Sequence, residues 1–184
     1  MKIGIKDGGP AMVGSFTPLE WQAKRIIKFM KTGEKLIQEL EEVLSGEPWY
    51  GPSIYDILGR VTFESAYERP LPAAHNVAEI ILHMLSWTEE VMDRLNGMTA
   101  GNPSSGDWPE PGAPDEQKWQ LWIDDLKLAN VNLVKIIAGF PEAQWLEPIN
   151  DKRGYAPVAT YKELVRGFIQ HQIYHAGQIA VLVK

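Results

Sequence analysis

The chain has 184 residues, with 24 acidic and 18 basic side chains, a formal net charge of −6 and no cysteine. Its length and its apolar content of 45% predict a folded core, so a wholly disordered chain is excluded. The acidic balance, without any basic run to hold phosphates, argues against a nucleic-acid-binding protein. The lack of cysteine excludes disulfides, thiolate metal sites and iron–sulfur clusters, so metal chemistry must use histidine, aspartate and glutamate.

The N-terminal residues 1–16 are a glycine-rich extension that precedes the predicted helices. They lack the continuous apolar stretch of a secretory signal peptide. No segment elsewhere approaches the roughly 20 apolar residues that are needed to cross a bilayer. We therefore expect a cytoplasmic protein with no membrane partner, in which residues 17–184 form a single domain.

The first predicted helix runs from Thr17 to about Ser45. Residues 17–20, Thr-Pro-Leu-Glu, have the pattern of a helix start, with an N-cap, a proline at the first helical position and a capping-box acid. Apolar residues then recur at helical spacing. Thr32-Gly33 is a weak point at which this helix is expected to bend or break. A short helix is predicted at residues 53–60.

Three further long helices follow, joined by long connections. Capping boxes mark two of the starts, Asn76 with Glu79 and Thr160 with Glu163. No convincing alternation of apolar and polar residues predicts a strand, so the expected fold is all-α, a four-helix bundle with long connecting loops. The predicted helices are about 76–95, 115–137 and 160–184, and the connections are 98–114 and 140–159.

Two histidines, His171 and His175, lie four residues apart in the last predicted helix. This spacing places both imidazoles on one face, one turn apart, where they can reach a single ion. The pair alone is a weak signal, and two solvated or hydrogen-bonded histidines are the alternative. Because Leu164 and Phe168 continue the same face, however, the pair lies on the side that the bundle buries.

His83 is a third candidate ligand, from the second long helix. It shares a face with Ile80 and Trp87 and is therefore expected to point inward. Three neutral nitrogens from two helices would bind Zn²⁺ or Ni²⁺ and leave a fourth position open to water or substrate. The alternative for His83 is a core histidine that is hydrogen-bonded to a polar neighbour. His75 precedes the Asn76 N-cap and is interpreted as a positioning or loop residue.

The motifs around these histidines resemble the DinB-like superfamily, which is named for damage-inducible bacterial proteins and includes bacillithiol-transferase-like members. The resemblance covers about residues 31–184. It is carried by Gly-Glu-Pro-Trp-Tyr-Gly-Pro-Ser at 46–53, Ala-His-Asn-Val-Ala-Glu-Ile-Ile-Leu-His-Met at 74–84, Trp87, His171 and Tyr-His-Ala-Gly-Gln-Ile at 174–179.

This resemblance implies a divalent metal, often zinc or nickel, held by His83, His171 and His175. Relatives include thiol-dependent transferases and isomerases, in which the metal activates a low-molecular-weight thiol, and metal-dependent hydrolases, in which it activates water. The implied function is an S-transferase or hydrolase acting on a small-molecule substrate. Homodimers are common in the family. Since the chain has no cysteine, a reacting thiol must arrive as a cofactor or substrate.

Three more side chains are candidates for the surroundings of the metal. Gln178 could hydrogen-bond a ligand or an imidazole. Glu79, one turn before His83, could accept a hydrogen bond or carry a proton, although its capping role already explains it. His75 is the third. Trp108, in the predicted loop, could wall a pocket or a dimer contact.

A non-enzymatic reading uses the same residues differently. In it the protein is a metal-binding or dimerising helical bundle with a stress-related role, and the histidines are structural. Substrate turnover and an open coordination position would favour the enzyme, whereas a fourth protein ligand would favour this alternative.

Overall fold

The computed structural model describes residues 17, 30–69, 75–154 and 156–183. The chain divides into two compact units, residues 1–30 and 31–184. The predicted extension at 1–16 and the predicted helix start at 17–20 lie outside the described residues, apart from Thr17 itself. Within the described part of the second unit the elements are helical, with one isolated bridge between Pro148 and Thr160. The predicted all-α class is confirmed.

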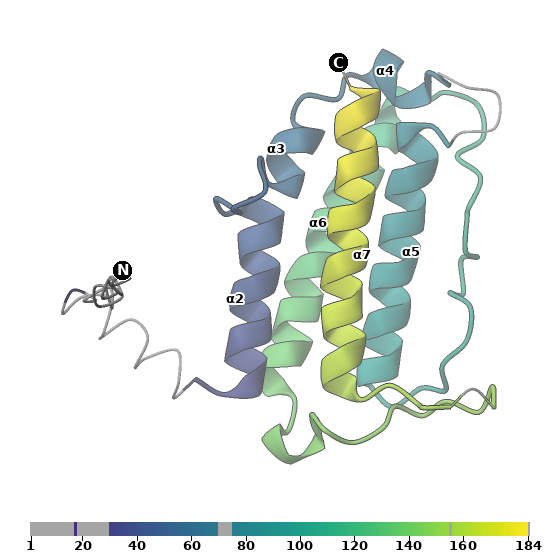
Figure 1. Ribbon diagram of the computed structural model, residues 1–184. Coiled ribbons are helices and arrows are strands. Elements are labelled where there is room, and N and C mark those ends of the chain that lie inside the picture. The colour runs from purple at the N-terminus through teal and green to yellow at the C-terminus, as the bar shows by residue number, and fades with distance from the viewer. Residues whose placement is uncertain (1–16, 18–29, 70–74, 155, 184) are drawn as a thin grey trace, which may run out of the picture. The chain divides into compact units, whose positions relative to one another are not determined.

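Four long helices make up the bundle of the second unit (Figure 1). They are α2 (Thr32–Ser45), α5 (Val77–Leu95), α6 (Glu116–Gly139) and α7 (Tyr161–Leu182). Three shorter elements lie in the connections: α3 (Ile54–Leu58), α4 (Phe63–Tyr67) and the 3₁₀ turn η1 (Glu142–Gln144). The predicted helices beyond residue 50 are therefore found at their expected places.

The expected break at Thr32-Gly33 is the start of α2. Lys31 is in an extended conformation, and the helix begins at the next residue. Gly33 has a packing reason to lack a side chain, because a Cβ there would lie 2.9 Å from the carbonyl oxygen of Ile137 in α6. Glycine thus allows the start of α2 to approach the end of α6 closely.

Side-chain caps fix where α5 and α7 begin. Asn76 Oδ1 accepts a hydrogen bond from the Glu79 N–H at 2.9 Å, and Glu79 Oε2 accepts one from the Asn76 N–H at 3.0 Å. Thr160 and Glu163 form the same reciprocal pair at the start of α7. Since each cap sets the first residue of its helix, it also sets which residues further along face inward.

The direction of the helices explains one long connection. In Figure 1, α5 and α6 run the same way, so the chain must return along the whole bundle between them. Residues 96–115 make this return and lie beside α5. The loop is anchored at its first end, where the Ala100 N–H donates to the Asn150 carbonyl at 2.8 Å.

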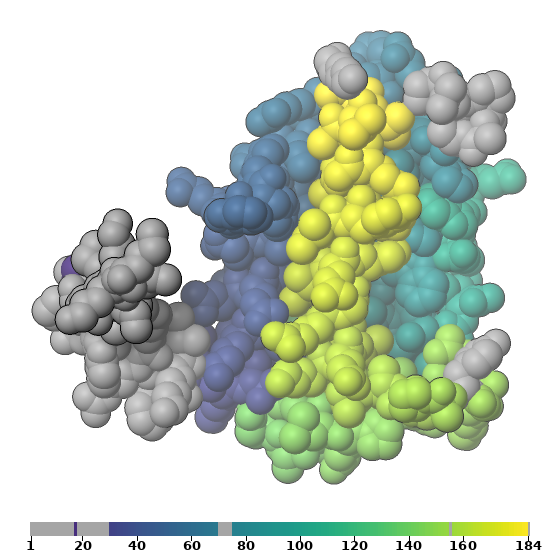
Figure 2. Space-filling model, viewed as in Figure 1, coloured from purple at the N-terminus to yellow at the C-terminus, as the bar shows by residue number. Residues whose placement is uncertain are grey.

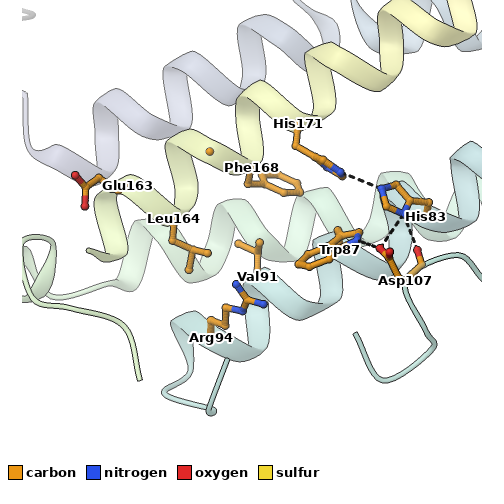
Figure 3. A pocket seen from close by; sticks show the side chains of 10 residues that line it. His83, Trp87, Val91, Arg94, Asp107, Glu163, Leu164, Phe168 and His171 are labelled. Carbon is orange, nitrogen blue, oxygen red and sulfur yellow. Dashed lines mark hydrogen bonds and ion pairs between the residues drawn. The ribbon is translucent and has the colours of Figure 1, made fainter. Parts of the chain in front are cut away.

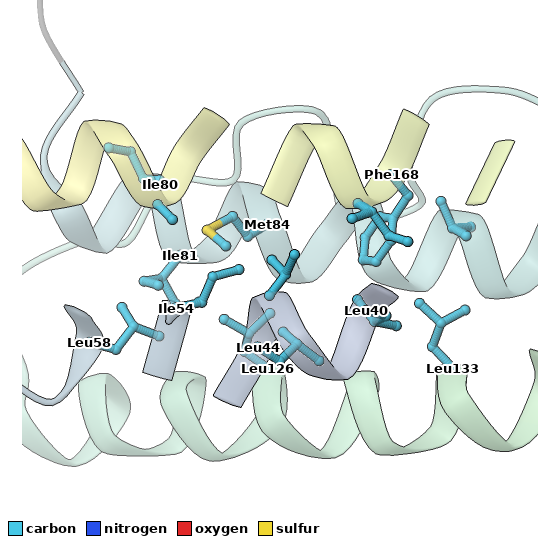
Figure 4. Packing of buried hydrophobic residues seen from close by; sticks show 14 of the residues in the cluster. Leu40, Leu44, Ile54, Leu58, Ile80, Ile81, Met84, Leu126, Leu133 and Phe168 are labelled. Carbon is cyan, nitrogen blue, oxygen red and sulfur yellow. The ribbon is translucent and has the colours of Figure 1, made fainter. Parts of the chain in front are cut away.

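The core is built from the inward apolar faces of the four long helices. Figure 4 shows Ile81 and Met84 of α5 in the same cluster as Leu126 of α6 and Leu44 of α2. Ile81, Met84 and Leu126 are fully buried. In the space-filling view, α7 runs along the visible face of this unit (Figure 2). No helix among the described residues has both the length and the apolarity needed to cross a membrane.

Candidate metal centre

Three histidines from two helices converge at one point. Nε2 of His171 lies 3.0 Å from Nε2 of His83 and 3.0 Å from Nε2 of His175. All three nitrogens lie within 4.8 Å of one another, an arrangement that could hold a metal ion. Figure 3 shows the His171 imidazole reaching from α7 toward His83 of α5. The three side chains that the sequence analysis named therefore lie together, and their role as metal ligands stays a prediction.

The outer ring nitrogens of two histidines are already engaged. Nδ1 of His83 lies 2.5 Å from the carbonyl oxygen of Asp107, and Nδ1 of His175 lies 2.7 Å from Oε1 of Gln178. A carbonyl oxygen only accepts, so each Nδ1 must carry the proton and donate it. The Nε2 atoms of both neutral rings are therefore left with bare lone pairs that point at the third histidine.

This proton arrangement tests whether a metal fits. His171 Nε2 can carry at most one proton, yet it lies 3.0 Å from two bare nitrogens. At least one of the two short contacts therefore joins lone pairs with no proton between them. A divalent cation between the rings removes this repulsion, and tetrahedral zinc with bonds of about 2.0–2.1 Å would hold its nitrogens about 3.3 Å apart. The donor set fits the metal.

Burial keeps these imidazoles neutral. It is the main cause that lowers the pKa of His171 to about 4, with repulsion from His175 and His83 adding to it. Burial likewise lowers the pKa of His175 to about 4, although the hydrogen bond to Gln178 opposes it. The pKa of His83 is also lowered by burial, against the opposing effect of the Asp107 carbonyl. Neutral imidazole is the form that binds metal.

The loop beside α5 orients His83. Besides the Asp107 carbonyl on Nδ1, the Asp107 carboxylate accepts a hydrogen bond from Trp87 Nε1 at 2.7 Å. Ser86 Oγ donates to the Gly106 carbonyl at 2.6 Å. The side chains of His83, Ser86 and Trp87 on α5 therefore hold loop residues 106–107 by hydrogen bonds. The sequence gives no sign of this role, because any residue at position 107 offers a main-chain carbonyl.

Trp108, the next loop residue, is stacked between two histidines. Its ring lies 3.8 Å from that of His83 at 11°, and 3.7 Å from that of His75 at 1°. It also meets His175 edge-on at 5.9 Å. The indole thus holds the plane of one candidate ligand and contacts the edge of another. It is not among the residues that line the described cavities, so its expected place as a wall stays a prediction.

The remaining candidates fall into two groups. Gln178 contacts the centre through His175, as expected, and its amide nitrogen donates to the Tyr174 hydroxyl at 3.2 Å. Glu79 has the capping role that already explained it, and the alternative role beside His83 is not found among the described contacts. Its carboxylate instead binds the Asn76 N–H, His75 Nδ1 at 3.1 Å and the guanidinium of Arg69. His75 acts through Trp108 and lies outside the cluster of ligating nitrogens.

A cavity of about 350 Å³ opens beside the centre, between α5 and α7. His83 and His171 line one end of it, and apolar side chains make most of the wall. These are Trp87, Val91, Leu164 and Phe168 (Figure 3). Substrate-sized molecules bind in cavities of this size and character.

Comparison with known proteins gives one match. No curated protein and no solved structure matches the chain. The sequence model of the DinB superfamily matches residues 54–179, a span that contains the three histidines and the loop at 98–114. This match covers more than half of the chain, and the chain therefore belongs to the DinB superfamily.

Proposed function

We propose that this protein is a metal-dependent enzyme of the S-transferase or hydrolase type that acts on a small molecule. The observation that carries the proposal is the convergence of three Nε2 atoms, two of them fixed as bare by hydrogen bonds on Nδ1. His83, His171 and His175 would hold the ion. A divalent ion such as zinc or nickel would supply Lewis acidity and lower the pKa of a bound thiol or water.

The surrounding residues support an open centre. Three protein nitrogens leave room in a tetrahedral shell for a further ligand, which is the pattern of catalytic sites. Among the described residues, the cluster contains no fourth His, Asp or Glu ligand. His83 and His171 face the cavity, so a substrate in the cavity would reach the centre from this side.

The protein's own groups would position the substrate and exclude water. Trp87, Val91, Leu164 and Phe168 offer apolar surface to the substrate body. The Asp107 carbonyl and Gln178 keep the proton of His83 and His175 on Nδ1. The chain has no cysteine, so a thiol nucleophile would be a separate molecule. The homodimer and the cytoplasmic location implied earlier stay predictions.

The test is a substrate panel on metal-loaded protein, assayed with and without bacillithiol. Thiol-dependent turnover identifies a transferase, and turnover of ester or amide substrates without thiol identifies a hydrolase. In both cases activity should disappear in His171→Ala and on treatment with a chelator. A protein that binds metal stoichiometrically but turns over neither class would contradict the proposal and favour the non-enzymatic reading.

A further inference from the structure

Arg94 lines the far end of the same cavity, away from the metal centre. It is only 6% exposed. Its Nε donates to Glu90 Oε1 at 2.8 Å, and its Nη2 donates to the Gly101 carbonyl at 2.8 Å. The guanidinium carbon lies 5.5 Å from the Trp87 ring centre. A buried arginine is thus held firmly against an aromatic wall of the cavity.

The guanidinium keeps unused donors. It has five N–H groups, and the two hydrogen bonds to Glu90 and Gly101 use two of them. No group among the described residues accepts a hydrogen bond from Nη1. Nη1 is not one of the fully buried polar atoms without a partner, so it is open to water or to a ligand in the cavity. The Nη1–Nη2 edge of arginine matches the two oxygens of a carboxylate.

The nearby acidic groups hold Arg94 without covering its Nη1–Nη2 edge. Glu90 is itself buried, and its Oε1 is shared between Arg94 Nε and the Gly101 N–H at 3.0 Å. Asp151, which also interacts electrostatically with Arg94, is paired with Arg153 at 2.6 Å. These four charges cancel, whereas Asp107 and Glu163 on the cavity wall add two negative charges, which the hydrogen bonds from Arg94 must offset when a carboxylate binds. Glu163, also on the cavity wall, is engaged by its Thr160 cap.

The cavity is elongated along the bundle. His83 and Arg94 are separated by about 16 Å of α5, and Leu164 and His171 by about 10 Å of α7, at 1.5 Å per residue. The guanidinium carbon lies 5.5 Å from the Trp87 ring centre, and the Trp87 ring lies 6.3 Å from the His83 ring. The distance from Arg94 to the metal centre is therefore on the order of 10 Å. Figure 3 shows this lengthwise order of residues on both helices.

We infer that Arg94 is a specificity-determining residue that binds the carboxylate of an elongated, mainly apolar substrate. The carboxylate lies at the end of the substrate remote from the metal, and the apolar body lies against Trp87, Val91 and Phe168. The inference rests on the proposed function in one respect, namely that the substrate reacts at the metal centre. The binding of the carboxylate itself needs only Arg94 and the cavity.

The experiment measures binding of three eight-carbon probes that differ at one end: octanoate, octanamide and octylamine. Titration calorimetry is run on the metal-loaded full chain and again after the metal is stripped, with circular dichroism to verify that the fold is kept. Octanoate should bind about tenfold more tightly than octanamide, since hydrogen bonds between charged groups are stronger than neutral ones. Octylamine should bind more weakly than both. Equal affinities for octanoate and octanamide would overturn the inference.

Variants connect this preference to Arg94. Arg94→Lys keeps the charge and loses the two-nitrogen edge, so the octanoate preference should fall about tenfold. The double variant Arg94→Gln with Glu90→Gln removes both partners and leaves no unpaired buried carboxylate, which protects the fold. It should bind octanoate and octanamide equally. Arg166→Gln is the matched control, because Arg166 lies on α7 with an exposed side chain 3.7 Å from Glu39 and outside the cavity lining.

The metal-free titration separates the two proposals. If octanoate binding vanishes with the metal and ignores Arg94, the carboxylate binds the metal and the inference is wrong. If binding depends on Arg94 while the protein takes up no metal, the inference stands and the proposed function fails.

Discussion

The two sides of α5 differ in chemistry. Toward α6 and α2 it presents Ile81 and Met84, which are fully buried in an apolar cluster with Leu126 (Figure 4). Toward α7 and the returning loop it presents His83 and Arg94, which are also buried but are polar and line the cavity (Figure 3). Apolar burial stabilises the fold directly, whereas buried polar groups cost free energy unless they are paired.

The distribution of buried polar residues sharpens this contrast. Ten polar or charged side chains among the described residues are buried, and seven of them belong to α5 or α7. Two of the other three, Ser53 and Asn76, are helix caps. The seven are His83, Ser86, Thr88, Glu90, Arg94, Gln172 and His175. Apart from the helix caps, most of the buried polar side chains thus belong to α5 or α7. A functional site is therefore expected along these two helices.

The largest expected effect is on metal affinity at the polar interface. His171→Ala removes the nitrogen that lies 3.0 Å from both partners. We expect at least about a thousandfold loss of zinc or nickel affinity, since each ligand carries a share of a binding free energy above 10 kcal/mol. Competition with a chromophoric chelator measures it. An affinity close to that of the unchanged protein would show that His171 is no ligand.

The matching change on the apolar side should affect stability instead. Leu126→Ala leaves a cavity in the core, and we expect the free energy of unfolding to fall by about 3 kcal/mol. Urea denaturation of the metal-free protein measures this, and metal stoichiometry should stay the same. Leu128→Ala, on the same helix but 57% exposed, is the control and should change stability by less than about 0.5 kcal/mol. A loss of metal in Leu126→Ala would contradict the view that the apolar side of α5 affects stability and not metal binding.

A smaller effect is expected where the loop supports the centre. Trp108→Ala removes the ring stacked on His83 and should lower metal affinity about 10- to 100-fold, as changes around metal ligands typically do. Trp108→Phe should restore most of it, because a stacking ring returns. Trp49→Ala is the control, since Trp49 is fully exposed. Equal affinities in Trp108→Ala and the unchanged protein would show that the stack does not position His83.

The smallest effect concerns the hydrogen bond from His175. Gln178→Ala removes the acceptor 2.7 Å from Nδ1, and we expect about a tenfold loss of metal affinity. Gln178→Glu keeps an acceptor and should bind metal nearly as well as the unchanged protein. If both variants lose affinity equally, the role of Gln178 is packing rather than acceptance of this proton.

Local signals explain why much of the fold was predictable. Capping pairs such as Asn76 with Glu79 define helix starts within a few residues, and these pairs form as expected. Once α5 and α7 have their starts, helical spacing places His83 and His175 on buried faces and the half-buried His171 beside them. The same signals predicted Gln178 near His175, because the two are three residues apart on one helix.

What the sequence did not predict depends on contacts between distant segments. The Asp107 carbonyl, the stack on Trp108 and the position of Arg94 at the cavity all follow from how residues 96–115 return along α5. A main-chain acceptor leaves no mark in the sequence. Glu79 has the capping role that already explained it in the sequence, and the alternative role beside His83 is not found, because its cap, His75 and Arg69 engage its carboxylate.

The central claim is that His83, His171 and His175 hold one divalent ion. The most direct test is the metal content of the purified 184-residue protein, by elemental analysis, beside that of the variant with all three histidines changed to alanine. We predict about one zinc or nickel ion per chain for the unchanged protein and none for the triple variant, which should stay helical by circular dichroism. A folded triple variant that retains stoichiometric metal would contradict the claim.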